Sequence, residues 1–294
     1  MPGFAPGIRA VPARRPPERG RVTALAAVWR HPTGRVGLVL VSFVVLFSLG
    51  GAWLIPWEPN RIAVLSRFQP PGWEHPMGTD QLGRDLAARL AYGGRVALGV
   101  ASVVLLLALG VGTGLGVAAA FAPAPLGRAI LGVFDLVGAF PGVVLALAVV
   151  ALLGPGLDRV VGIVAVTLMP QFGRVARAQA LALREGPMLE AARAVGVPAR
   201  RVLQVYVLPQ LAGPLLVLAG MSVPAVITVE AGLSFLGVGV PPPRASWGTL
   251  LNDGYVNLGR SVWGVVFPAG MLAVATLGFT LLGEAVRDWT EGGR

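Results

Sequence analysis

The sequence predicts an all-α polytopic membrane protein with six transmembrane helices. Apolar side chains make up 55% of its 294 residues and charged side chains only 13%, whereas soluble domains carry about 25% charged residues. The chain accordingly contains long uncharged stretches, and about 20 apolar residues are enough for a helix to cross a bilayer. We therefore expect spans at residues 36–55, 96–121, 129–153, 157–176, 212–236 and 261–283.

The six spans differ in how clearly the sequence marks them. The first, second and sixth carry no charge, whereas Asp135 interrupts the third and Glu230 the fifth. The fourth is the weakest, because only residues 160–173 run uncharged before Arg174, and Pro170 lies among them. Ionisable groups within spans usually face the bundle interior or water. Asp135 and Glu230 are therefore candidates for a polar path across the membrane or for hydrogen bonds within the bundle.

The placement of arginine predicts the orientation. All 24 basic residues are arginine, and an N-terminus on the inside puts 16 of them inside and 8 outside. Such an excess is typical of cytoplasmic segments. Both ends, residues 1–35 and 284–294, are then expected in the cytoplasm, the first as an Arg- and Pro-rich disordered tail. Residues 56–95 are expected to form an external segment, and 96–283 to form the core.

Missing residue types exclude several chemistries. Without lysine the chain cannot form a P-loop, whose lysine contacts the phosphates of ATP, and without cysteine it has no disulfide or thiolate ligand. His31 and His75 lie on opposite sides of the first span, so we expect no metal site, and no motif indicates a catalytic site. The net charge of +10 comes largely from arginines beside apolar spans, and no nucleic-acid motif accompanies it.

Residues 75–95 predict a short amphipathic helix outside the membrane. Thr79 or Asp80 suits its N-cap, and Gly93-Gly94 suits a break before the second span. A structural role on the membrane surface, a direct gate and a contact with an external partner all fit this pattern. The expected apolar stripe is Leu82, Leu86 and Leu90, and the expected i,i+4 ion pair is Asp85 with Arg89.

Residues 184–211 predict a helix-turn-helix in the cytosol. Pro187 suits a helix start, and Gly196 can adopt the left-handed conformation that ends a helix. Pro198 can begin the next helix, and Pro209 is expected to help end the segment. Such an exposed surface suits docking into a groove of another protein; a solvated connecting loop is the alternative.

The detailed spacing of this segment resembles the EAA loop of ABC importer permeases. Glu-Ala-Ala at 190–192 precedes Gly196, and Tyr-Val-Leu-Pro at 206–209 stands where that family has Ile-x-Leu-Pro. The resemblance extends over nearly the whole chain after about residue 30, to the C-type subunit of the dipeptide, oligopeptide and nickel group. It also rests on residues 75–80, 83–85, 230–237, 246–248 and 267–268, and on Pro170, Arg174 and Arg177.

The resemblance implies a type I ABC importer permease fold and a set of partners. These are a homologous second permease, two P-loop ATPase subunits that bind ATP and Mg, and an extracytoplasmic substrate-binding protein, assembled at the inner membrane. This chain would hold no cofactor of its own. The implied cargo is a peptide or a similar small solute, with a nickel chelate as an option. An ion-gradient-driven secondary transporter is the alternative function.

Individual residues of this chain are candidates for specific roles in such an importer. Glycine at 196 is expected to set the angle between two short helices of the coupling loop. Asp135 and Glu230 are the candidates for the translocation path or the bundle interior. The residues implied in coupling to the ATPase are Glu190, Ala191, Ala192, Gly196, Leu208 and Pro209.

Overall fold

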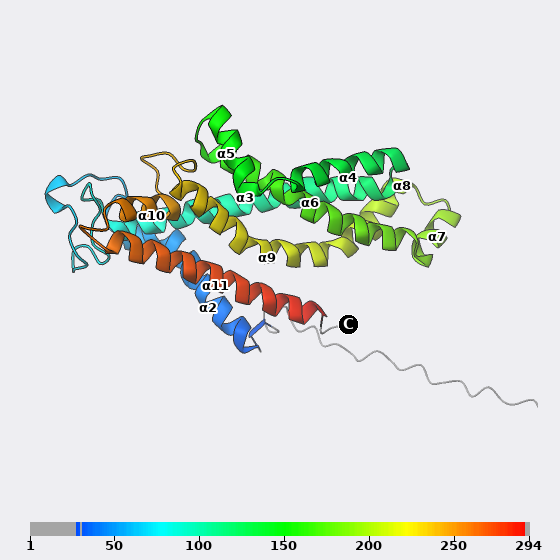
Figure 1. The fold of residues 1–294 in the computed structure, drawn as a ribbon. Coiled ribbons are helices and arrows are strands. Elements are labelled where there is room, and N and C mark those ends of the chain that lie inside the picture. The colour runs from blue at the N-terminus through cyan, green and yellow to red at the C-terminus, as the bar shows by residue number, and fades with distance from the viewer. Residues whose placement is uncertain (1–27, 30, 292–294) are drawn as a thin grey trace, which may run out of the picture.

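The computed structural model describes residues 28, 29 and 31–291, and this part of the chain is helical without a β-strand. Five helices are long and apolar enough to cross a membrane (Figure 1). A sixth crossing exists if the pair α4 and α5, bent by 85°, is one broken span. The helices concerned are α2 (Pro32–Leu54), α3 (Leu86–Phe121), α4 (Ala124–Gly138), α5 (Gly142–Leu153), α6 (Leu157–Arg184), α9 (Leu208–Phe235) and α11 (Trp263–Glu291).

These helices confirm the predicted fold class. Several continue past the predicted spans: α3 has 36 residues and, at 1.5 Å per residue, is about 54 Å long, well beyond a hydrocarbon core of about 30 Å. Helix α6 ends at Arg184, eight residues after the predicted end. Most of the expected N-terminal tail (1–27 and 30) and the last three residues, 292–294, lie outside the described residues.

Shorter helices occupy the two ends of the molecule. Figure 1 shows α10 and the segment between α2 and α3 at one end, and α7 and α8 at the other. The predicted external segment and the predicted cytosolic helix-turn-helix therefore lie at opposite ends of the bundle. The short elements are η1 (Val64–Ser66), α7 (Pro187–Ala194), α8 (Ala199–Arg201), the π-helix η2 (Val202–Val207) and α10 (Trp247–Val256).

The third predicted span, 129–153, is not one straight helix. It breaks between Gly138 and Gly142, where Pro141 is the N-cap of α5. Proline has no N–H to donate, and it disfavours helical backbone in the residue before it. Phe-Pro-Gly at 140–142 was therefore a local signal for a break that the hydropathy pattern concealed.

Close packing of α3 on α6 depends on glycine. A Cβ atom on Gly116 would overlap the backbone of Gly173, and one on Gly112 would lie 2.7 Å from the carbonyl oxygen of Met169. Gly114 faces open space, with nothing within 4 Å of its Cβ position. Two of the span's glycines, four residues apart, thus form the small-xxx-small contact that lets two backbones approach.

The predicted separate helix in the external segment is wrong. Helix α3 begins at Leu86, with Asp85 as its N-cap, and continues unbroken through Gly93 and Gly94. Those glycines make room for neighbours: a Cβ on Gly93 would contact the backbone of Ser246, and one on Gly94 would contact the side chain of Ser48. Small size, and not backbone freedom, is what these positions require.

Candidate functional site

The loop predicted to couple to a partner begins with α7 and ends that helix as expected. Gly196 has φ of +77°, and the N–H of Val197 donates to the carbonyl of Ala192 at 3.0 Å. This is the 6→1 hydrogen bond of a Schellman motif, with glycine at the position that requires left-handed backbone. The predicted helix stop at Gly196 is confirmed.

Buried apolar side chains fix this loop to the bundle. Leu189 is 1% exposed, and it belongs to one cluster with Val202 and Val207 and with the C-terminal half of α6 and the N-terminal half of α9. The opposite surface is open: Glu190, Ala191 and Gly196 are exposed, and Ala192 is half-buried. Met188 and Val195 add exposed apolar surface, the latter 84% exposed. The loop is thus an anchored element with a mixed polar and apolar outer face.

Pro209 does not help to end the segment as predicted. Leu208 and Pro209 form the first turn of α9, where a proline is tolerated. The turn before them is a π-helix, in which the N–H of Leu208 donates to the carbonyl of Leu203, five residues back. Both residues are exposed. The loop therefore passes into α9 without an intervening non-helical link.

Asp135 and Arg174 form an ion pair between α4 and α6. The guanidinium Nη2 lies 2.8 Å from Oδ1 of the carboxylate, and the two side chains are 51% and 72% exposed for Arg174 and Asp135 respectively. The sequence marked both residues as charged groups near or within spans, but it did not predict their pairing.

Glu230 lies in the bundle interior. Its side chain is fully buried at 0% exposure, and Ser234 Oγ donates to its Oε1 at 2.7 Å. The same serine oxygen accepts from the N–H of Val240 at 3.2 Å. The second carboxylate oxygen, Oε2, has no hydrogen-bond partner among the described residues. Glu230 therefore ties α9 to the segment that follows it, and it does not reach the surface.

A charge cluster at the opposite end was missed by the sequence analysis. Asp80 accepts from Arg84 Nε at 2.6 Å and lies 3.5 Å from Arg89 Nε. Arg84 Nη2 lies 3.7 Å from Asp253 of α10. The predicted pair of Asp85 with Arg89 is therefore wrong, because Asp85 instead accepts from the Ala88 N–H at 2.7 Å.

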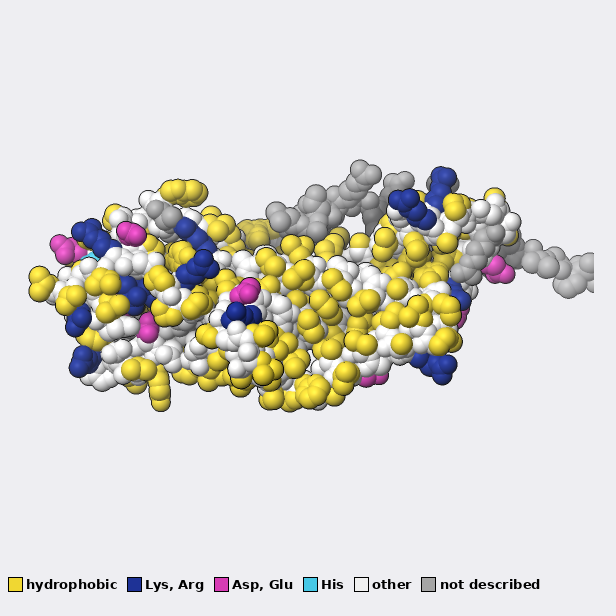
Figure 2. Space-filling model, turned by 90° about the horizontal axis from the view of Figure 1, so that it is seen from above, with side chains coloured by type: hydrophobic (Ala, Val, Ile, Leu, Met, Phe, Trp, Pro, Cys, Tyr) yellow, Lys and Arg dark blue, Asp and Glu magenta, His cyan; other side chains and the backbone are white. Residues whose placement is uncertain are grey.

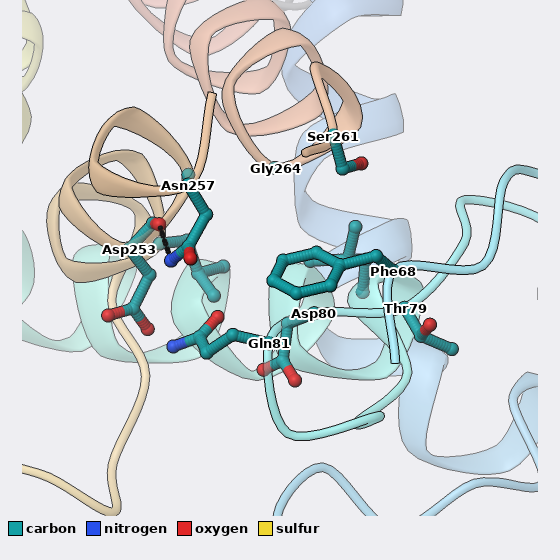
Figure 3. Close-up of a pocket in the computed structure, with 11 residues that line it drawn as sticks. Phe68, Thr79, Asp80, Gln81, Asp253, Asn257, Ser261 and Gly264 are labelled. Atoms are coloured by element: carbon teal, nitrogen blue, oxygen red, sulfur yellow. Dashed lines mark hydrogen bonds between the residues drawn. The ribbon is translucent and has the colours of Figure 1, made fainter. Parts of the chain in front are cut away.

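Figure 3 shows Asp80 and Asp253, the two carboxylates of this cluster, at a small cavity between the segment preceding α3 and helices α10 and α11. The side chain of Gln81 lies between those of Asp80 and Asp253, and Asn257 donates to the backbone carbonyl of Asp253. The cavity that these groups and Phe68 line is only about 10 Å³. That is too small for a solute. We therefore assign the cluster a structural role, in which it holds the segment preceding α3 against α10.

The distribution of side chains matches a membrane protein. Figure 2 shows charged side chains mostly toward the two ends of the visible face, with hydrophobic ones over the stretch between. Large apolar side chains of α2 and α3 are also exposed, among them Leu46 at 69% and Leu106 at 68%. Such a surface is stable against lipid or a second apolar subunit.

Comparison with known proteins agrees with these features. Residues 110–291 match the family described as binding-protein-dependent transport system inner membrane component. The dipeptide transport system permease protein DppC of Escherichia coli is 36% identical over 278 residues, which are 91% of this chain and 92% of that protein. The di/tripeptide transport system permease protein DppC of Pseudomonas aeruginosa is 35% identical over 267 residues, 88% of each chain.

A solved structure shares the fold. The chain superposes on the inward-facing MetNI methionine ABC transporter with a TM-score of 0.54 and 18% identity, over 66% of this chain and 93% of that one. At this identity the likeness concerns the fold alone. None of the relatives and structures named here is an ion-driven secondary transporter, so the alternative function gains no support.

Proposed function

Because the chain belongs to the family of binding-protein-dependent transport system inner membrane components, we propose that it carries peptides or a similar small solute into the cell. It is a multi-pass permease subunit of an ABC importer. The peptide assignment is supported by the names of its relatives, two of which are dipeptide and di/tripeptide permeases. A nickel chelate is the alternative cargo.

The energy for import comes from other subunits in this proposal. A chain without lysine lacks the P-loop residue that contacts ATP phosphates. Two ATPase subunits would bind ATP and Mg, and a second permease and an external binding protein would complete the importer. The orientation supported by the arginine distribution places both termini and α7 in the cytoplasm.

The observation that carries the coupling proposal is the anchored but exposed α7. Its buried Leu189 fixes it to the inner ends of α6 and α9, while Glu190 and Gly196 face outward. An ATPase that held this outer face and moved would displace both long helices together. Those helices carry Arg174 and Glu230, so motion at the loop would reach the middle of the bundle.

Affinity purification from native membranes in mild detergent tests this proposal. We expect a homologous permease and P-loop ATPases to co-purify with the tagged chain. Glu190→Arg should release the ATPases while the second permease stays bound, and Glu58→Arg, the same charge reversal at an exposed position at the opposite end of the molecule, serves as the matched control. Purification of the chain without any ATPase would overturn the coupling mechanism.

A further inference from the structure

We propose that the Arg174–Asp135 ion pair binds the two charged ends of a zwitterionic solute during its passage. Arg174 receives the carboxylate of the solute and Asp135 its ammonium group. This inference rests on the proposed import function and specifies the chemical class of the cargo. Its basis is a pair 2.8 Å apart whose two side chains are both at least half exposed.

The positions of neighbouring residues on α3 and α6 define the depth of the Arg174–Asp135 pair in the membrane. Helix α3 carries no charge from residue 96 to its end at Phe121, and Gly116 of this stretch packs against Gly173, the neighbour of Arg174. Further along α6, Arg184 donates to the carbonyl of Ala120 at 2.7 Å. Arg174 and Arg184 are ten helical residues apart, about 15 Å along α6. The Arg174–Asp135 pair therefore lies within the uncharged, membrane-spanning part of the bundle.

The exposure of this pair indicates what covers it. A charged group in contact with lipid tails is costly, and intramembrane charges almost always face a bundle interior or a water-filled cavity. This chain leaves Asp135 72% exposed. The pair therefore faces water or another subunit, and a permease that moves polar solutes has water in its path.

The broken helix lies at the same place. Helix α4 ends at Gly138, three residues after Asp135. A Cβ atom on Gly138 would lie 3.7 Å from Arg174 Nη2. Non-helical backbone at membrane depth is tolerated only where it is buried in protein or lines an aqueous cavity. An exposed ion pair and a helix break thus indicate the same face of the subunit as the wall of the path.

An apolar cavity next to the break completes the site. It has a volume of about 170 Å³ and lies between α5, α6 and α9. Thr167, one of its lining residues, is seven residues before Arg174 and so lies on the same face of α6, two turns away. The cavity can take an aliphatic side chain of the solute while the ion pair takes its ends. Its lining is Gly142, Val143, Val164, Thr167, Leu168, Ala225, Val226 and Val229.

Charge balance explains why a zwitterion fits this site. The pair is neutral as a unit, and exchanging partners with a carboxylate and an ammonium keeps the total charge at zero. A single anion or cation would pair with only one of the two side chains and leave the other without a counter-charge at membrane depth, whereas a zwitterion pairs with both. Selectivity for solutes with both charges follows without a permanent net charge in the path.

A neutral double variant separates binding from a structural role. Arg174→Gln and Asp135→Asn each leave one charge unpaired, so either role predicts a defect in the single variants. The double variant removes both charges and keeps two amides that can pair. If the ion pair only joins α4 to α6, the double variant should regain transport; if the pair binds solute, transport should stay at least tenfold below wild type while ATP hydrolysis remains stimulated by the binding protein.

The measurement uses the complete importer in proteoliposomes and radiolabelled alanyl-alanine. Arg128→Gln, an exposed arginine at the other end of α4, is the matched control and should keep uptake within twofold of wild type. Wild-type uptake that does not depend on ATP would overturn the import function itself. ATP-dependent wild-type uptake together with full uptake by the double variant would overturn only the present inference.

A binding measurement without the external protein tests the charge class directly. We expect millimolar alanyl-alanine to raise the Tm of the detergent-purified importer, because a ligand that binds only the folded state stabilises it. N-acetyl-alanyl-alanine amide, which lacks both charges, should not raise it, and the double variant should respond to neither. An equal shift with both compounds, or an unchanged shift in the double variant, would contradict the proposal.

Discussion

The indole N–H of Trp247 donates a hydrogen bond to the backbone carbonyl of Leu90, at 2.9 Å across 157 residues of sequence. Trp247 begins α10 and is fully buried at 0% exposure, and its ring lies against Gly93 and Gly94 of α3. One side chain therefore fixes helix α10 on the N-terminal part of α3. This contact explains why two adjacent glycines occur in a helix that does not break there.

Replacing Trp247 tests this contact. Trp247→Phe keeps an aromatic ring but removes the hydrogen bond and part of the volume, so we expect a loss of about 1 to 3 kcal/mol of stability. Thermal unfolding in detergent measures it. Trp263→Phe, which changes a half-buried tryptophan at the start of α11, is the control and should unfold near the wild-type temperature.

The α3–α6 contact provides a second matched pair of substitutions. Gly116→Ala places a methyl group on the backbone of Gly173, so the two helices must separate. Gly114→Ala adds the same methyl group in open space, where alanine is the better helix former by about 1 kcal/mol. We expect a lower Tm and poorer assembly for Gly116→Ala only. Equal behaviour of the two variants would show that this approach of α3 to α6 does not limit stability.

Local patterns and long-range pairings were not equally predictable. Hydropathy located the spans, and glycine at position 196 between two helical runs predicted a turn, because both signals lie within a few residues. The pairing of Arg84 with Asp253 joins segments far apart in the chain, and only tertiary packing sets it. The N-cap role of Asp85 was missed for a different reason, because the arginine four residues later offered an equally good local partner.

Proline was the residue whose effect depended most on context. Pro141 breaks the third span, whereas Pro170 lies inside α6 without ending it, and Pro209 begins α9 instead of ending the loop. Sequence position alone does not supply that information.

The coupling loop predicts a dependence on backbone conformation at Gly196. Its Cβ position has nothing within 4 Å, and its φ is +77°, so a side chain there would strain the backbone without a clash. Gly196→Val should cost about 1 to 3 kcal/mol locally and change the angle between α7 and α8. We expect normal membrane insertion and loss of ATP-dependent uptake.

Gly196→Asn is the control for that variant, because asparagine tolerates left-handed backbone far better than valine. It should retain much of the uptake and of the co-purifying ATPase. If the valine variant transported as well as the asparagine variant, the conformation of this residue would have no part in coupling.

The Glu230–Ser234 hydrogen bond predicts the mobility of the segment after α9. Ser234 Oγ bonds both the buried carboxylate and the N–H of Val240. Ser234→Ala should therefore release that segment, at a cost of about 1 kcal/mol per lost hydrogen bond. Because the chain contains no cysteine, Val240→Cys provides a single labelling site at a position that is only 4% exposed, and its reaction with a maleimide should become faster when the segment is released.

Ser222→Ala distinguishes this effect from the mere loss of a serine on α9. Ser222 donates only to the carbonyl of Leu218 in its own helix, so its removal should leave the labelling rate unchanged. Glu230→Gln keeps an oxygen that accepts from Ser234 and should also label slowly, whereas Glu230→Leu should label as fast as Ser234→Ala. A fast rate in Glu230→Gln alone would mean that the negative charge, and not the hydrogen bond, holds the segment.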